Sequence, residues 1–587
     1  MQRIRERHVD FAVYFGLAAI AGLLYHSVLR SYFLYDDPFM LRSAINHAPW
    51  EYFYKPEVWR QFNVSYLTPW VPLSYGLDLR LFGIDPKLFY LHQLVAVWLA
   101  SVMLYKVLKI WTGGLAAIGA VFFLVSAPAA ATTEILMFRA YIEGSLFVLL
   151  SVYFFVKSVR NASPFYSVLS AVFYAAAISA KEIFLPLGIV VLFLPEGDVK
   201  KRISRAVPLM AVLALYIPWR YRMLGDLLAG PGGRLFPGYE GLHSVTLFIK
   251  DIYGSFGMLS GISPASSFVN PVVAAVFFCF VVLSSLILAK ERNYLPLVFF
   301  ALVLLSVYAV PLSIINFSLA AADSSVYRLM VLIDICLAAV FTVSASFLYH
   351  RLKRSGFSPS LRTALTRMVA LVFAGTVLLV LWHATRWIQN ERRTVLKPLA
   401  EEGRFFWTAN RDVLLVKSSP LYGGFYYYEN LEYFRRLYLH ERSPMVVYDV
   451  FAFVDDPDSP ILKNKRVYKY NPVTSAISDI TSSYVKERAA YLARVRNLPL
   501  EARLTLDRGD FRYAIGPSNS GRYFLLLGYK PDLYCMKFEV REFETRIPIN
   551  IKMYCRFGWE SPDGGVTFSP EWFVDSSKKQ DIFWERR

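Results

Sequence analysis

The sequence predicts an α-helical polytopic membrane protein with a C-terminal extracytoplasmic α+β domain, and three observations support this fold class. The 587 residues are 56% hydrophobic and 16% aromatic, with a mean hydropathy of +0.38, which is too apolar for a soluble multidomain protein. Long apolar runs recur from residue 11 to residue 387, with short basic clusters between them. The part after residue 391 has no such run.

The formal net charge of +18 does not indicate a nucleic-acid partner. Most Lys and Arg residues lie in short clusters between apolar runs, where they orient helices against the anionic inner leaflet. We therefore expect membrane lipids, and no nucleic acid, as partners.

The first apolar run covers residues 11–29 and follows the basic start MQRIRERHVD. It is long enough to cross the hydrocarbon core and is not followed by a small-residue cleavage site, so we expect an uncleaved signal anchor. The positive-inside rule then places the N-terminus in the cytoplasm and Asp36-Asp37 on the outer face.

Residues 31–86 form the predicted first outer loop. This segment mixes Trp, Tyr, Pro and charged residues, which is typical of short helices that lie in the membrane interface.

Further apolar runs bring the predicted number of spans to about eleven. They cover 87–109, 113–131, 140–158, 164–180, 183–195, 204–222, 268–289, 294–313, 326–348 and 364–387. An odd number of crossings places the C-terminal part outside the cytoplasm. We expect a transmembrane domain over 1–391 and an outer domain over 392–587, in an integral protein of the bacterial inner membrane with a periplasmic C-terminal domain.

The predicted outer domain contains short apolar or alternating segments separated by Pro, Gly and Asp turns, such as DVLLV, MVVYDVFAFV, RYFLLLGY, MKFEVREF and INIKMYCRFGW. Such segments are typical of strands. Cys535 and Cys555 fall on predicted neighbouring strands, and an outer location would allow a disulfide between them.

The acidic pair Asp36-Asp37 comes directly after the first span and before Pro38. Two adjacent carboxylates at a membrane surface suggest a catalytic role. Asp before Pro is also a common turn former, because Asp accepts backbone hydrogen bonds and Pro presets the bend.

Other charged side chains fall at the outer ends of predicted helices, where a shared polar cavity would explain them. Each of these side chains also has a purely structural explanation. Arg139 and Glu143 could form an i, i+4 ion pair, and Lys181-Glu182 could cap a helix at the interface. Arg220 and Arg222 could snorkel to the membrane surface, Arg328 could pair with Asp323, and His92 could serve helix packing. The candidate substrate-binding residues are Arg139, Lys181, Glu182, Arg220, Arg222, Tyr327, Arg328 and His92, with Glu134 as a further catalytic carboxylate.

Glycosyl transfer from a polyprenyl-phosphate sugar fits this combination of groups. A carboxylate can deprotonate the acceptor hydroxyl as general base, and cations can stabilise the phosphate that leaves from the sugar C1. A helix bundle supplies the apolar cleft that a long prenyl chain needs.

Four segments resemble a known family. SYLTPWVPLSYGLDLRLFGIDPKLFYLHQL (65–94) is similar to the first outer loop of multispanning O-mannosyltransferases, notably those that carry tetratricopeptide repeats, in the GT-C superfamily. The stretch around Glu134 and Arg139 is similar to that family's second outer-loop motif, SAKEIFLPL (179–187) to its SKE hairpin, and VYRLM (326–330) to the arginine-containing start of a late helix.

The resemblance implies a GT-C-like fold with Asp36 and Asp37 as catalytic carboxylates, Glu134 and Arg139 in the second outer loop, Lys181 and Glu182 in the hairpin, and Arg328 as phosphate ligand. It also implies an inverting, metal-independent enzyme with no cofactor. Ala127 replaces the family's His, and the repeats are absent, so the mannose donor and the protein acceptor do not carry over. The expected partners are a polyprenyl-phosphate sugar and a protein or glycan acceptor.

Two other classes compete with this interpretation. A transporter or flippase of lipid-linked sugars would show inverted repeats and half-helices broken at the midplane, which the sequence lacks. A non-catalytic membrane assembly factor would tolerate substitution of Asp36.

Overall fold

The structure is a computed structural model that describes residues 2–63, 66–194, 196–225, 331–354, 358–418, 424–507, 510–517, 519–539, 542–546 and 551–586. The chain forms two compact units. The first comprises Met1–Arg30, Ser65–Ser74 and Arg80–Glu391, and the second comprises Ser31–Val64, Tyr75–Leu79 and Arg392–Arg587.

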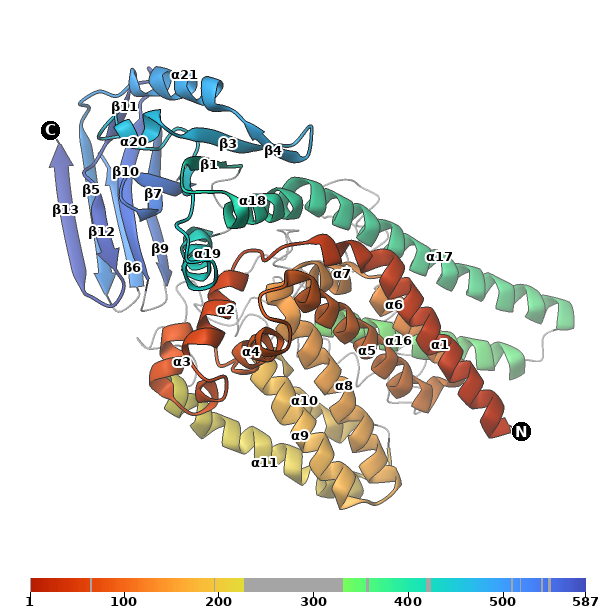
Figure 1. The fold of residues 1–587 in the computed structure, drawn as a ribbon. Coiled ribbons are helices and arrows are strands. Elements are labelled where there is room, and N and C mark those ends of the chain that lie inside the picture. The colour runs from red at the N-terminus through yellow and green to blue at the C-terminus, as the bar shows by residue number, and fades with distance from the viewer. Residues whose placement is uncertain are drawn as a thin grey trace. The chain divides into compact units, whose positions relative to one another are not determined.

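The first unit is helical (Figure 1). Its helices are α1 (Gln2–Tyr25), η1 (His26–Arg30), α5 (Pro86–Thr112), η3 (Gly113–Leu115), α6 (Ala116–Leu124), α7 (Ala127–Glu134), η4 (Leu136–Phe138), α8 (Arg139–Arg160), α9 (Pro164–Ala180), η5 (Glu182–Phe184), α10 (Leu187–Val190), η6 (Val191–Phe193), α11 (Val199–Leu224), α16 (Val331–Arg354) and α17 (Pro359–Glu391). Within the described residues, four segments are long and apolar enough to cross a membrane: Arg7–Arg30, Pro86–Leu124, Leu136–Arg160 and Val331–Lys353.

Two predicted spans take a different form. The run 113–131 is divided between α6 and α7, because the Ser126 side chain caps α7 by accepting a hydrogen bond from the Ala129 N–H at 3.3 Å. The run 183–195 contains only η5, α10 and η6, which are too short to cross a bilayer. The predicted spans 268–289 and 294–313 lie outside the described residues, and the count of eleven is not confirmed.

The predicted first outer loop folds into short helices of the second unit. These are α2 (Asp37–Asn46), η2 (Glu51–Phe53) and α3 (Pro56–Phe62), while α4 (Trp70–Phe82) carries residues of both units. Aromatic side chains form a small core here, because the Trp59 ring lies 5.1 Å from Phe62 and 6.3 Å from Tyr52.

The C-terminal part begins with η8 (Arg392–Leu396) and α18 (Lys397–Thr408) and continues as a mixed sheet. Its strand order is β2-β1-β3-β4, with β1 (Val413–Lys417) parallel to β2 (Met445–Tyr448) and β3 (Arg466–Asn471), and β4 (Ala476–Asp479) antiparallel to β3. Helices α19 (Gly424–Tyr438), α20 (Pro460–Lys463) and α21 (Thr481–Leu492) follow β1, β2 and β4 along the chain.

Two antiparallel sheets complete the second unit (Figure 1). One has the order β11-β10-β7-β8 with β12 paired to β10, and the other has the order β13-β5-β6-β9. Their strands are β5 (Leu500–Asp507), β6 (Asp510–Gly516), β7 (Arg522–Lys530), β8 (Leu533–Phe538), β9 (Glu542–Arg546), β10 (Lys552–Glu560), β11 (Val566–Phe568), β12 (Trp572–Asp575) and β13 (Gln580–Arg586). The predicted fold class, a helical polytopic membrane protein with a C-terminal α+β domain, is confirmed.

The predicted disulfide is wrong. Cys535 on β8 and Cys555 on β10 are both buried free thiols. Strand β7 lies between their strands in the sheet, which places the two Cα atoms about two strand spacings apart, roughly 9.5 Å, beyond the reach of a disulfide. The sequence analysis expected all three strands, RYFLLLGY among them, but not the position of that strand between the other two.

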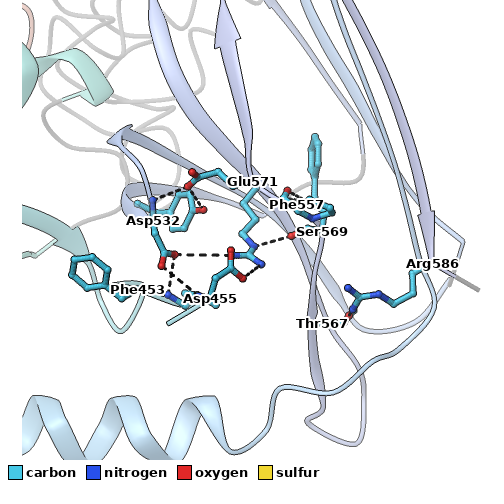
Figure 2. A network of polar contacts seen from close by, with 12 residues as sticks. Phe453, Asp455, Asp532, Phe557, Thr567, Ser569, Glu571 and Arg586 are labelled. Carbon is cyan, nitrogen blue, oxygen red and sulfur yellow. Dashed lines mark hydrogen bonds and ion pairs between the residues drawn. The ribbon is translucent and has the colours of Figure 1, made fainter. Parts of the chain in front are cut away.

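A polar network ties the loop after β2 to β8, β10 and the segment before β12 (Figure 2). Arg556 donates to the Ser569 carbonyl at 2.8 Å and to Asp455 at 2.5 Å, and its guanidinium lies 4.0 Å from Asp532. Asp532 also accepts hydrogen bonds from the Val454 and Asp455 N–H groups at 2.9 and 3.3 Å. Burial nevertheless raises the pKa of Asp532 to about 6.

Candidate functional site

The acidic pair occupies the turn that leads into α2. Tyr35 has a φ of 47°, Asp36 is the N-cap residue of α2, and Asp37 and Pro38 open its first turn. A non-glycine residue with this φ is strained by about 1–2 kcal/mol, so the surrounding contacts must hold the turn. Pro38 favours the helix start because it has no N–H to satisfy.

The two carboxylates have different surroundings. Asp37 is fully buried, and its carboxylate accepts hydrogen bonds from the Leu34 N–H at 2.7 Å and from the Tyr75 hydroxyl at 2.6 Å. Asp36 is only partly buried. Asp37 therefore fixes the turn, while Asp36 remains accessible to a second molecule.

Contacts within the second unit hold the residues before the turn. The Tyr427 hydroxyl on α19 donates to the Phe33 carbonyl at 2.8 Å. Gly403 on α18 lies so close to Tyr32 that an added Cβ would come within 2.9 Å of that ring. The C-terminal domain thus supports the acidic turn directly.

A second cluster, in the first unit, is centred on Glu143 of α8. Its carboxylate accepts hydrogen bonds from Trp70 Nε1 at 2.6 Å and Ser74 Oγ at 2.8 Å, and it lies 3.6 Å from His92 Nε2. Arg139, which is completely buried, donates to Ser74 Oγ at 3.1 Å. The structure therefore brings Arg139 and His92 together around Glu143, with Ser74 linking Arg139 to Glu143 by hydrogen bonds.

A third cluster, also in the first unit, surrounds the predicted Lys181-Glu182 hairpin. Glu182 accepts from the Leu67 N–H at 3.0 Å and from Tyr216 at 2.5 Å, and it makes a close ion pair with Arg220. Its charge is therefore neutralised by Arg220 of α11.

Lys181 is held differently from its neighbour Glu182. The Lys181 ammonium lies 4.4 Å from the centre of the Tyr66 ring and 5.5 Å from that of Tyr141. It makes no ion pair with a carboxylate among the described residues. A cation held by aromatic faces keeps its charge available for an anion.

The remaining predicted site residues join none of these three clusters through a described contact. Glu134 is buried at the end of α7, and Arg222 is exposed near the end of α11. Tyr327, Arg328 and Asp323 lie outside the described residues.

No group of three or more His, Cys, Asp or Glu side chains in the described part of the chain could hold a metal ion. Metal-independent chemistry remains a prediction.

Several residues of these clusters were not predicted as site residues. Trp70, Ser74 and Tyr75 support the carboxylates, and Tyr66 and Tyr216 complete the hairpin cluster. Four of the five lie in the stretch 65–94 that carries the family resemblance, so the signal was present there. Tyr216 lies in an apolar run, where a sequence gives no sign of its partner.

No family model and no curated protein matches the chain. Among solved structures, it is similar to the oligosaccharyltransferase AglB of Archaeoglobus fulgidus in complex with an inhibitory peptide and a dolichol-phosphate, at 12% identity over 92% of this chain and 76% of AglB, with a TM-score of 0.42. It is also similar to ArnT of Cupriavidus metallidurans bound to undecaprenyl phosphate, at 13% identity over 74% of this chain and 85% of ArnT, with a TM-score of 0.38. Both TM-scores lie below 0.5, so these likenesses do not by themselves assign the chain to a family. The O-mannosyltransferase branch remains a prediction.

Proposed function

We propose that the protein is a GT-C-type membrane glycosyltransferase that transfers a sugar from a polyprenyl-phosphate donor to an acceptor hydroxyl on the outer face of the membrane. The observation that carries the proposal is the difference between the two carboxylates of the acidic turn. Asp37 is buried and accepts hydrogen bonds from the Leu34 N–H and the Tyr75 hydroxyl, while Asp36, its neighbour at the start of α2, is only partly buried.

Asp36 acts as the general base. Its carboxylate takes the proton of the acceptor hydroxyl while that oxygen attacks the sugar C1, and the bond from C1 to the phosphate oxygen breaks. The polyprenyl phosphate leaves with the bonding electron pair. A single displacement of this kind inverts the configuration at C1.

Lys181 binds the donor phosphate in this proposal, because its surroundings within the first unit leave its charge available. Tyr66 and Tyr141 orient its ammonium without neutralising it, whereas Arg220 is already paired with Glu182. A cation at the phosphate stabilises the charge that develops as the donor bond breaks. Arg328 would be a second phosphate ligand, as the family resemblance implies.

The enzyme is expected in the bacterial inner membrane with its C-terminal domain in the periplasm. The basic clusters between apolar runs support this orientation.

Transfer of a radiolabelled sugar from synthetic undecaprenyl-phosphate sugars to cell-envelope acceptors tests the proposal. Asp36→Asn should lower the single-turnover rate by about a hundredfold or more, because the base is lost while the size of the side chain is kept. Asp85→Asn is the matched control, since Asp85 caps α5 through the Lys87 N–H at 3.0 Å and Asn caps equally well. Equal rates for both variants, with the fold intact, would refute the catalytic role of Asp36.

A further inference from the structure

The second unit contains a small polar groove between α2, α3 and α19, and none of its lining residues has a role in the proposed reaction. Its volume is about 120 Å³, which is room for roughly four water molecules or for part of one sugar ring. The groove is lined by Phe39, Arg42, Ser43, Asn46, His47, Tyr52, Val58, Gln61, Phe62, Glu429, Asn430 and Ile551.

The polar side chains of this groove are held in fixed orientations. Arg42 donates to Glu429 at 3.2 Å and to the Asn430 side chain at 3.1 Å, and its guanidinium lies 4.8 Å from the centre of the Tyr433 ring. The Tyr433 hydroxyl donates to Asn46 at 2.9 Å. The groove therefore offers preorganised donors and acceptors, which lowers the entropic cost of binding.

The balance of charge excludes a phosphate as the preferred ligand. Arg42, the one Arg or Lys among the described lining residues, is paired with Glu429 at 3.2 Å, so its charge is already compensated. Planar amide, guanidinium and carboxylate groups instead match the paired hydroxyls of a neutral polyol. The Phe39 and Phe62 rings, stacked at 5.5 Å, add an apolar face for sugar C–H groups.

The groove also lies within reach of the acidic turn. Helix α2 begins at Asp37 and runs into the groove, and a rise of 1.5 Å per residue puts Arg42 about 7.5 Å along the axis from Asp37. A ligand of one or two sugar rings bound beside Arg42 can thus extend a hydroxyl toward Asp36.

We infer that this groove binds the acceptor and that the acceptor is a neutral glycan. The inference rests on the proposed function for its role in catalysis, but the groove's affinity for sugars does not depend on turnover. An extended peptide acceptor would instead add a strand to an exposed sheet edge, which the helices α2, α3 and α19 around the groove do not offer.

Saturation-transfer NMR on the full chain in nanodiscs tests the inference with methyl glycosides of glucose, galactose, mannose and N-acetylglucosamine as probes. At least one glycoside should receive saturation at its ring protons. Asn46→Ala and Gln61→Ala, which change exposed side chains and leave the fold intact, should weaken its affinity about fivefold to tenfold, the effect of one lost hydrogen bond.

Arg436→Ala is the matched control, because Arg436 is an exposed arginine of α19 that does not line the groove. It should leave the affinity unchanged. Binding of a pool of Ser- and Thr-containing acetylated tripeptides in place of the glycosides would overturn the inference, and so would an absence of binding by both probes. Glycoside binding in a protein that transfers no sugar would refute only the proposed function. Turnover that is insensitive to both groove variants would refute only the groove.

Discussion

The acidic turn holds a buried carboxylate, Asp37, and the hairpin cluster holds a partly buried one, Glu182, but the described partners of the two differ. Glu182 is paired with a cation, Arg220, and also accepts from Tyr216 and the Leu67 N–H. The two described hydrogen bonds to the Asp37 carboxylate come from neutral donors, the Leu34 N–H and the Tyr75 hydroxyl. The ion pair joins α11 to the hairpin, whereas the two described donors to Asp37 hold the acidic turn.

This difference separates residues that stabilise the helix bundle from residues that take part in the proposed reaction. The buried carboxylate fixes the backbone of the turn and so holds its partly buried neighbour Asp36 in place. A general base has to be held within hydrogen-bond reach of the proton that it removes, whereas a structural ion pair only joins two elements.

The largest expected effect comes from breaking the ion pair. Arg220→Met leaves the Glu182 charge buried without its cation, so we expect the free energy of unfolding to fall by about 3–5 kcal/mol. Thermal unfolding of the full chain in detergent measures the loss.

The double variant Arg220→Met with Glu182→Gln gives the control, because Gln keeps a carbonyl for the Tyr216 and Leu67 donors. It should recover most of the lost stability, with a coupling energy that a double-mutant cycle reports. A double variant as unstable as Arg220→Met alone would show that helix packing, and not charge, explains the first result.

The fold class was predictable from composition and periodicity, whereas the contacts between residues that are distant in the sequence were not. The runs that became α5, α8, α9, α16 and α17 are visible in the sequence, as are the strands around Leu414 and Leu525. The division of 113–131 depends on one capping hydroxyl, Ser126, inside an otherwise uniform apolar run. Local pattern does not reveal such a break.

The candidate site shows the same limit. Asp36-Asp37 could be singled out because the pair follows a span, but the pattern treats the two carboxylates alike. Their separation into a buried and an accessible group depends on Tyr75, nearly forty residues away. The predicted disulfide between Cys535 and Cys555 was wrong for a related reason, since the order of strands in a sheet depends on contacts that are distant in the sequence.

The next effect concerns Asp532, a carboxylate that has both neutral donors and a cation beside it. Asp532 accepts two N–H donors and lies 4.0 Å from Arg556, yet burial raises its pKa to about 6 (Figure 2). The folded state then binds a proton more tightly than the unfolded state, in which Asp has its usual pKa near 3.8. The contribution of Asp532 to stability is therefore largest below about pH 4, falls by about 3 kcal/mol at most as the pH rises toward 6, and stays level above it.

Asp532→Asn should remove this slope, because the amide has no proton to lose in that range. Thermal unfolding of the full chain between pH 4 and pH 7 measures it. Asp458→Asn, at an exposed position near the same loop, should leave the slope as in the wild type. An unchanged slope in Asp532→Asn would show that another titrating group, and not Asp532, produces it.

The smallest expected effect concerns the link between Asp37 and Tyr75. Tyr75→Phe removes one donor to a buried carboxylate and should cost about 2 kcal/mol of stability. Because Asp37 fixes the turn, the loss should also misplace Asp36 and lower the single-turnover rate about tenfold. Tyr25→Phe serves as the control, since its hydroxyl donates to the Leu124 carbonyl at 2.7 Å in the first unit and should affect stability alone. If Tyr75→Phe lowered stability but left the rate unchanged, Asp37 would be a structural residue like Glu182, and the two regions would no longer differ in kind.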